Sequence, residues 1–233
     1  MDLHKYNLIS KSFFIINAWK AIYFQKKINL FINSKKINKM DFLSNEEGYL
    51  RASTYLNSVA GKFGLTREQM TRMKPTPSEL YVNSLLSAGG TAHLLTGNST
   101  QETGVTNFDG NRLEQGRYFV INAITILYGE AAADKKVWEV DYSKELPAVL
   151  LSSHLVVRQN GETIVKLPVS SINNAKQSDA YYRELEALAV IEPTQTIELM
   201  IETPQGSSIT PTNSGDKSFV RVLLKGFETY LKR

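Results

Sequence analysis

The sequence predicts a mainly β protein, an antiparallel β-sandwich of the jelly-roll type behind an N-terminal helical segment. After Gly90 the spacing of apolar residues changes from three- and four-residue steps to the strand-like period of two. Seven or eight such runs follow, most of them separated by polar turns, and no long helical pattern alternates with them. This arrangement argues against a parallel α/β sheet and favours a sandwich.

The strands are predicted from runs of β-branched and aromatic residues. The run at residues 118–128 is nearly continuous, which is typical of a central strand buried on both faces. Asn160-Gly161 separates two such runs and predicts a tight hairpin. Gly226 predicts a bulge or bend within the long run at 219–231, for which we expect a central place beside Ile197–Glu202. The other predicted strands are residues 137–140, 155–159, 163–167 and 185–191.

Helical signals precede these strands. Apolar residues from 46 to 63 recur at helical spacing, and Thr66 with Gln69 forms a capping-box pattern for a second, short helix. Thr76-Pro77-Ser78-Glu79 combines an N-cap, a proline at the first helical position and a glutamate that reaches back, which predicts a third helix ending at Gly89-Gly90. The apolar face of the first helix either covers its own sandwich or docks on a neighbouring subunit.

The first 39 residues differ from the rest in charge and composition. They contain eight lysines and one acidic residue, whereas the following 194 residues carry a net charge of −3. Lys, Ile, Asn, Phe and Tyr fill 26 of these 39 positions, as expected of translated AT-rich DNA, so we hypothesise that Met40 is the true start. The alternatives are a basic arm that contacts nucleic acid and an amphipathic helix on a membrane surface.

The chain therefore divides into three predicted parts. Residues 1–39 form the basic leader, residues 40–90 a helical shoulder and residues 91–233 the β-sandwich domain. Two long polar loops, at 97–116 and 204–217, exceed the usual connection length. Such loops are usually binding or assembly surfaces, or simply mobile.

Residues for catalysis or metal binding are scarce. The absence of cysteine excludes thiolate chemistry and cysteine-ligated metals, and three histidines leave little for an all-histidine centre. Ser153 and His154 are neighbours on a strand, so they point to opposite faces and do not meet as nucleophile and base. Asp109-Gly110-Asn111 lacks the alternating acids of a calcium loop and predicts a turn. We expect no catalytic, cofactor-binding or metal-binding residues, no cofactor and no small-molecule substrate.

The remaining candidates have plain structural interpretations. The glutamates at 184, 186, 192, 198 and 202 fit the solvated side of strands, although carboxylates on a strand face can also line a sugar-cleaving cleft. Trp138 and the pair Tyr181–Tyr182 are interpreted as core or interface residues. A platform for sugars or bases is the alternative for these aromatic side chains.

Three segments together resemble capsid-type virion structural proteins of bacterial viruses. They are residues 106–120 (TNFDGNRLEQGRYFV), residues 155–162 with 166–168, and residues 220–229. The resemblance extends over about residues 105–233. It implies a non-enzymatic shell protein, assembled in many copies, with its loops at contacts between subunits.

The expected function is therefore that of a capsid or capsid-associated subunit in a phage virion assembled in the host cytoplasm. Its expected partners are copies of itself and other virion proteins, with nucleic acid or a membrane surface contacted through residues 1–39 if these are expressed. Assembly is expected to use loops and sheet edges. The main alternative is a carbohydrate-binding or adhesion sandwich that uses Trp138 or Tyr181–Tyr182, and a sugar-active enzyme is a third.

Overall fold

The computed structural model describes residues 44–73, 75–86, 90–177 and 180–230. The chain divides into two units, residues 1–47 and 48–233, and the second contains both sheets. The basic leader at 1–39 and Met40 lie outside the described residues. The elements are α2 (Ser44–Val59), α3 (Arg67–Arg72), β1 (Thr76–Leu85), β2 (Thr91–His93), β3 (Arg117–Ala132), the 3-10 helix η1 (Val137–Glu139), α4 (Ala148–Leu151), β4 (His154–Gln159), β5 (Glu162–Pro168), α5 (Val169–Gln177), β6 (Arg183–Ile191), β7 (Ile197–Glu202) and β8 (Asp216–Tyr230).

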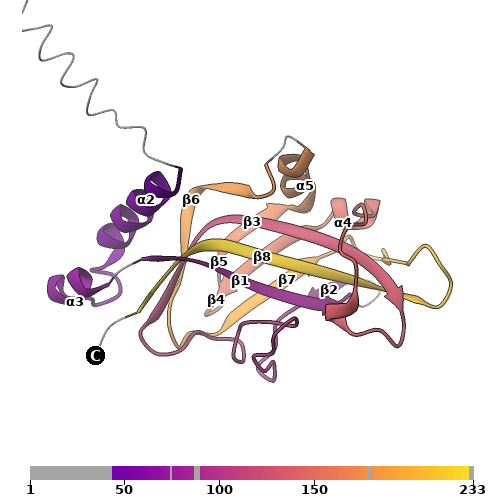
Figure 1. Ribbon diagram of the computed structural model, residues 1–233, viewed down its shortest axis with the longest axis horizontal. Helices are drawn as coiled ribbons and strands as arrows, with labels where there is room; N and C mark the ends of the chain where they lie inside the picture. The colour runs from indigo at the N-terminus through magenta and orange to yellow at the C-terminus, as the bar shows by residue number, and fades with distance from the viewer. Residues whose placement is uncertain (1–43, 74, 87–89, 178–179, 231–233) are drawn as a thin grey trace, which may run out of the picture. The chain divides into compact units, whose positions relative to one another are not determined.

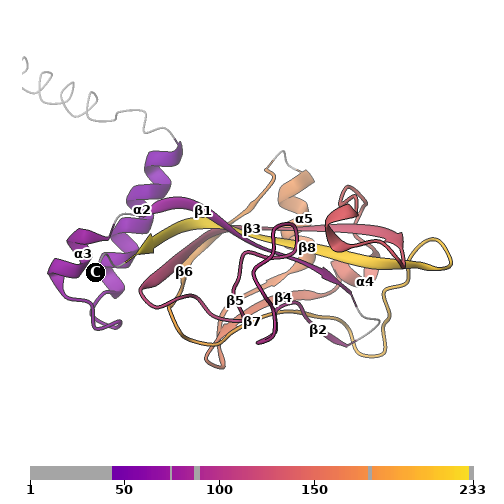
Figure 2. The same ribbon diagram turned by 60° about the horizontal axis from the view of Figure 1, so that its bottom comes forward.

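The strands form two four-stranded antiparallel sheets, so the expected mainly β architecture is confirmed (Figure 1). Sheet A has the order β1-β8-β3-β6 and sheet B the order β2-β7-β4-β5. The pairs are nested: β4 pairs with β5, β3 with β6, β2 with β7, and β1 with β8. The chain thus follows the path of one long hairpin with the β4–β5 turn at its tip. Strands β1 to β4 form one arm of this hairpin and strands β5 to β8 the other, and each sheet contains two strands from each arm (Figure 2).

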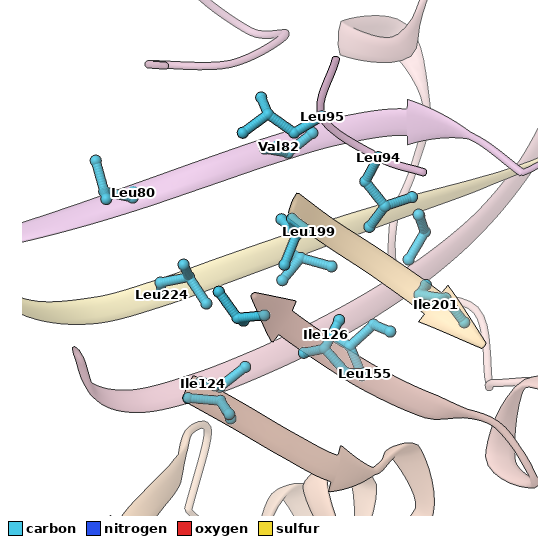
Figure 3. Packing of buried hydrophobic residues seen from close by; sticks show 14 of the residues in the cluster. Leu80, Val82, Leu94, Leu95, Ile124, Ile126, Leu155, Leu199, Ile201 and Leu224 are labelled. Atoms are coloured by element: carbon cyan, nitrogen blue, oxygen red, sulfur yellow. The ribbon is translucent and has the colours of Figure 1, made fainter. Parts of the chain in front are cut away.

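One hydrophobic core lies between the two sheets. Strands β1, β3 and β8 of sheet A and strands β4 and β7 of sheet B direct aliphatic side chains toward one another (Figure 3). The central residues are all buried: Leu80, Val82, Ile124, Ile126, Leu155, Leu199, Ile201 and Leu224. Burial of such side chains is the main contribution to the stability of a fold of this kind.

One end of the outer face of sheet A is covered by α2, which decides between the two alternatives for this helix. Ala52 and Leu56 are buried against Val120 of β3, so the apolar face of the helix covers its own sandwich. The predicted capping box at α3 is confirmed, because the Thr66 side chain accepts from the Gln69 backbone N–H and the Gln69 side chain accepts in return. Strand β3 is accordingly buried on both faces along most of its length, as expected.

The third predicted helix is wrong, because residues 76–85 form strand β1. All ten residues pair with β8, from Thr76 opposite Glu228 to Leu85 opposite Phe219. The local capping signal is outweighed by this pairing and by the core, which receives alternate side chains of the strand. Pro77 is tolerated because β1 is an edge strand, where a missing N–H donor leaves no gap in the sheet.

Three further expectations need correction. Residues 137–139 form η1 instead of a strand, and their apolar residue Val137 packs on the outer face of sheet A. Strand β7 does not lie beside β8, since it pairs with β2 and β4 in sheet B. Helix α5 is absent from the sequence prediction. Its Val169 and Ile172 follow one another at helical spacing and are both buried in the core.

The hairpin and the bulge occur where the sequence predicts them. Asn160 and Gly161 both have positive φ, at 50° and 81°, as a two-residue turn between paired strands requires. The register of β3 against β8 shifts between Ile121 and Ala123, opposite Gly226. A Cβ atom on Gly226 would lie 1.8 Å from the Val120 carbonyl oxygen, so only glycine permits this close approach.

Candidate assembly surface

The free edge of β1 is covered by the loop that contains residues 104–107. The Asn83 N–H donates to the Val105 carbonyl at 2.8 Å, and the Tyr81 N–H donates to Asn107 Oδ1 at 2.8 Å. Thr106 Oγ1 donates to the Tyr81 carbonyl at 2.9 Å. Part of the long predicted loop at 97–116 therefore forms hydrogen bonds with backbone N–H and C=O groups of β1. These groups of the edge are then not available to a strand of another chain.

The other three sheet edges are also unsuited to pairing with another chain. The Arg51 guanidinium donates to the carbonyls of Leu185 and Glu186 on β6, at 2.8 and 2.6 Å. Strand β5 carries Lys166, Pro168 and a register shift, all of which disfavour pairing at an edge, and β2 has only three residues. These features disfavour pairing of a strand from another chain with the sheet edges.

The outer face of sheet B carries an ionic network. Glu202 accepts from Lys166 Nζ at 2.8 Å and from the Arg158 guanidinium at 3.3 Å. The hydrogen bond from Lys166 is the main cause of a lowered Glu202 pKa. Val156 and Met200 are buried on this face, which we attribute to the aliphatic stems of the two cations lying over them. Glu202 thus belongs to the solvated side of its strand, as expected.

Trp138 and Tyr181 do not lie in the core, so of the two expected roles for these aromatic residues, core or interface, only the second remains open to them. Trp138 is 48% exposed and Tyr181 is 48% exposed. Tyr181 packs edge-on against Tyr182, whose hydroxyl donates to Glu79 Oε1 at 3.0 Å. The spacing of residues in the sequence carries no information on which aromatic side chains the tertiary fold leaves exposed, so it could not identify these two rings as exposed. A fixed, exposed tryptophan is typical of interface anchors.

A groove of about 440 Å³ lies between the end of α2, the β4–β5 hairpin and β6. Its apolar and aromatic lining residues are Tyr55, Val59, Phe63, Ile164, Leu188, Ala189 and Val190. Its polar lining residues are Lys62, Gln159, Asn160, Glu162, Glu192 and Gln195. A hollow that combines apolar and aromatic walls with polar and charged groups has features of a binding site.

Two carboxylates of this groove, Glu162 and Glu192, form no ion pair with another described residue, and the lining of the groove contains one cationic side chain, Lys62. Burial raises the pKa of Glu192, and the negative charge of Glu162 raises it further. Gln159 holds the Glu192 backbone in place, accepting from its N–H and donating to its carbonyl, both at 2.9 Å. The fold therefore positions two mutually repelling negative charges beside apolar walls, which favours a cationic partner.

The side chains that the sequence analysis considered for catalysis or calcium binding take part in local structural contacts. Ser153 is buried and its hydroxyl donates to the Val149 carbonyl at 2.7 Å, whereas His154 is half-buried and pairs in register with Glu202. Asp109 bridges to Arg112 around Gly110, as a turn requires. In the described ranges no group of three His, Asp or Glu side chains could hold a metal ion. None of the described helices is long and apolar enough to cross a membrane.

One polar cluster has no counterpart among the sequence predictions. The Glu130 carboxylate accepts from Lys144 Nζ at 2.5 Å, from the Tyr128 hydroxyl at 2.8 Å and from Thr212 Oγ1 at 3.3 Å. Burial alone raises the pKa of Glu130, but these hydrogen bonds outweigh it and lower the pKa to about 2. The cluster joins β3 to the loops at 133–147 and 203–215. A glutamate at a strand end gives no sequence signal of such a role.

Comparison of the chain with family models, curated proteins and solved structures finds no match. The strand order, the covered edges and the exposed surfaces described above are therefore the features that bear on function.

Proposed function

We propose that the two sheets form a jelly roll and that the protein is a non-enzymatic capsid or capsid-associated subunit of a phage particle. The observation that carries this proposal is the nested pairing of eight antiparallel strands into the orders β1-β8-β3-β6 and β2-β7-β4-β5. A hairpin of eight strands rolled into two sheets is the arrangement that defines a jelly roll, and viral capsid domains use it repeatedly. Lectin domains and cupins share it, so the strand order alone does not choose among them.

Three features favour a shell subunit among these classes. The edges are covered or blunted, which prevents uncontrolled strand pairing while leaving faces and loops for specific contacts. Long loops flank the sandwich at 97–116 and 203–215. Residues 105–233 resemble virion proteins in sequence. The expected partners are further copies of the chain and other virion proteins, and the expected location is the virion.

Size-exclusion chromatography with light scattering, followed by negative-stain electron microscopy of the full chain, tests the proposal. We expect closed particles of many subunits that form above a critical protein concentration. A protein that stays monomeric over a wide range of concentration and salt would refute a shell role.

The rival function, carbohydrate binding, is favoured by a second hollow. A cavity of about 630 Å³ lies between α5 and the start of β6, next to the exposed Tyr181, and its lining includes Tyr182, Arg183 and Glu184. An aromatic ring beside charged and hydroxyl-bearing side chains is suited to a sugar. A stable monomer that binds immobilised glycans, and loses binding on Tyr181→Ala, would support this function instead.

A further inference from the structure

We propose that the groove lined by Glu162 and Glu192 receives residues 135–138 of a second copy of this chain, with Trp138 as the anchor. These four residues, Lys135, Lys136, Val137 and Trp138, form a largely exposed segment that we call the knob. The inference rests on the proposed shell function and names the contact that would build the shell. Three observations support it. The knob is exposed and held in a fixed position, the groove complements it in polarity and charge, and knob and groove lie far apart within one chain.

The knob presents Trp138 in a fixed position. Val137 packs against the cluster on the outer face of sheet A, and the Tyr142 hydroxyl donates to the Val137 carbonyl at 2.7 Å. On the other side Gly104 contacts the Trp138 side chain so closely that a Cβ on Gly104 would lie 2.9 Å from the Trp138 Cβ. A held but half-exposed tryptophan loses little conformational freedom when it is buried by a partner, which is the property of an anchor residue.

The groove complements the knob in both polarity and charge. Its aromatic and aliphatic walls suit the indole ring. Its two carboxylates, Glu162 and Glu192, outnumber its one cationic lining residue, Lys62, and form no ion pair with another described side chain. Directly after the knob, Glu139 accepts from the Lys136 backbone N–H and lies 3.8 Å from Lys135 Nζ, whereas the Lys136 ammonium forms no ion pair with another described residue. Asp134 offsets the charge of one of the two lysines, so attraction between charges is the smaller part of the proposed contact. Trp138 therefore supplies most of the contact, and Lys136 sets the orientation of the knob in the groove.

Knob and groove lie at different ends of sheet A. The groove includes Val190, which pairs with Val120 near the start of β3, whereas Val137 of the knob packs with Leu127 farther along the strand. Seven residues of β3 separate these positions, which corresponds to roughly 20 Å at about 3.3 Å per residue. One copy therefore offers its knob while its own groove stays open. Such a head-to-tail contact repeats from subunit to subunit and produces rings where the rotation closes, which further contacts would join into a shell.

The test compares the critical concentration for assembly of the full chain and its variants by light scattering, with circular dichroism to confirm folding. Trp138→Ala is expected to raise the critical concentration about tenfold or more, as for other tryptophan anchors. The matched control is Tyr181→Ala, which removes an equally exposed ring outside the contact and is expected to leave assembly unchanged. Lys136→Glu and Glu162→Lys are each expected to weaken assembly, and the double variant to recover most of it.

The outcomes separate this inference from the function on which it rests. A wild-type chain that forms particles, with variants that assemble at the same concentration, would overturn the knob-and-groove contact and leave the shell function standing. A wild-type chain that never assembles would overturn both. Weakened assembly in Glu162→Lys with normal assembly in Trp138→Ala would mean that another segment fills the groove, which also overturns the assignment. Recovery in the charge-exchanged double variant supports it directly.

Discussion

Replacing Glu130 by glutamine removes the charge that joins the end of β3 to two loops. The side chain of Glu130 is 5% exposed, and its pKa of about 2 lies below the ordinary value of 4.5 because hydrogen bonds from Lys144, Tyr128 and Thr212 outweigh the effect of burial. A tenfold change in proton affinity is worth about 1.4 kcal/mol, so the gap corresponds to about 3 kcal/mol. Lys144 is 43% exposed, and solvent screening on its side reduces the expected effect to about 2 kcal/mol.

The sign of the pH dependence follows from the direction of the shift. A carboxyl group whose pKa is lowered by folding stabilises the folded state above its unfolded pKa, here about 4.5, and loses that contribution as the pH falls toward 2. Denaturant unfolding of wild type and Glu130→Gln at pH 7, 5, 4 and 3 measures the difference. We expect it to be about 2 kcal/mol at pH 7 and to shrink steadily below pH 5.

Glu139→Gln is the matched control for this substitution. Glu139 is an exposed carboxylate on the connection after β3, and its ion pair with Lys135 is long, at 3.8 Å. Its replacement is expected to change the free energy of unfolding by less than about 0.5 kcal/mol. A Glu130→Gln effect that stays constant between pH 7 and pH 3, or that equals the control, would refute the electrostatic explanation and leave only a packing effect.

Two further pairs of substitutions test the fold. Gly226→Ala is expected to prevent folding or to lower the free energy of unfolding by more than about 3 kcal/mol, because the new Cβ would clash with the Val120 carbonyl. Gly61→Ala, whose new Cβ would lie in open space, is expected to leave the stability unchanged or to raise it. Thermal unfolding measures both effects. Leu56→Ala is expected to lower the free energy of unfolding by about 3 kcal/mol in a denaturant titration, and Leu50→Ala, on the exposed side of α2, by less than about 0.5 kcal/mol. If both leucines cost the same, α2 does not cover sheet A as described.

The structural features that the sequence predicts best are turns and caps, whose signals lie within a few residues. Asn160-Gly161 specifies a two-residue turn through backbone conformations that few other residues adopt, and the hairpin is found there. The Thr66–Gln69 capping box is equally local and equally correct. Thr76–Glu79 carries a comparable helix signal that is misleading, because pairing with β8 over ten residues outweighs a cap of about 1 kcal/mol.

The candidate surface is much less accessible to sequence analysis. Trp138 can be identified as a candidate residue, but its position depends on the close approach of Gly104 and on the hydrogen bond from Tyr142 to the neighbouring Val137 carbonyl, both of which exist only in the folded chain. The groove combines α2, the β4–β5 hairpin and β6, which are distant in sequence, so no spacing could bring Glu162 and Glu192 together. For the same reason the sequence could not decide between a core and an interface role for the aromatic residues, of which Trp138 and Tyr181 are exposed.

The sequence by itself determined the class of this protein, a mainly β chain with a hairpin at 160–161 and a long buried strand at 118–128. Those properties follow from backbone preferences and from the period of apolar residues, both of which act over a few positions. Only the tertiary structure decided that β1 is a strand, that β7 belongs to sheet B and which aromatic rings stay exposed. Pairing between distant segments decides these features, and a local pattern carries no information on which partner a strand will find.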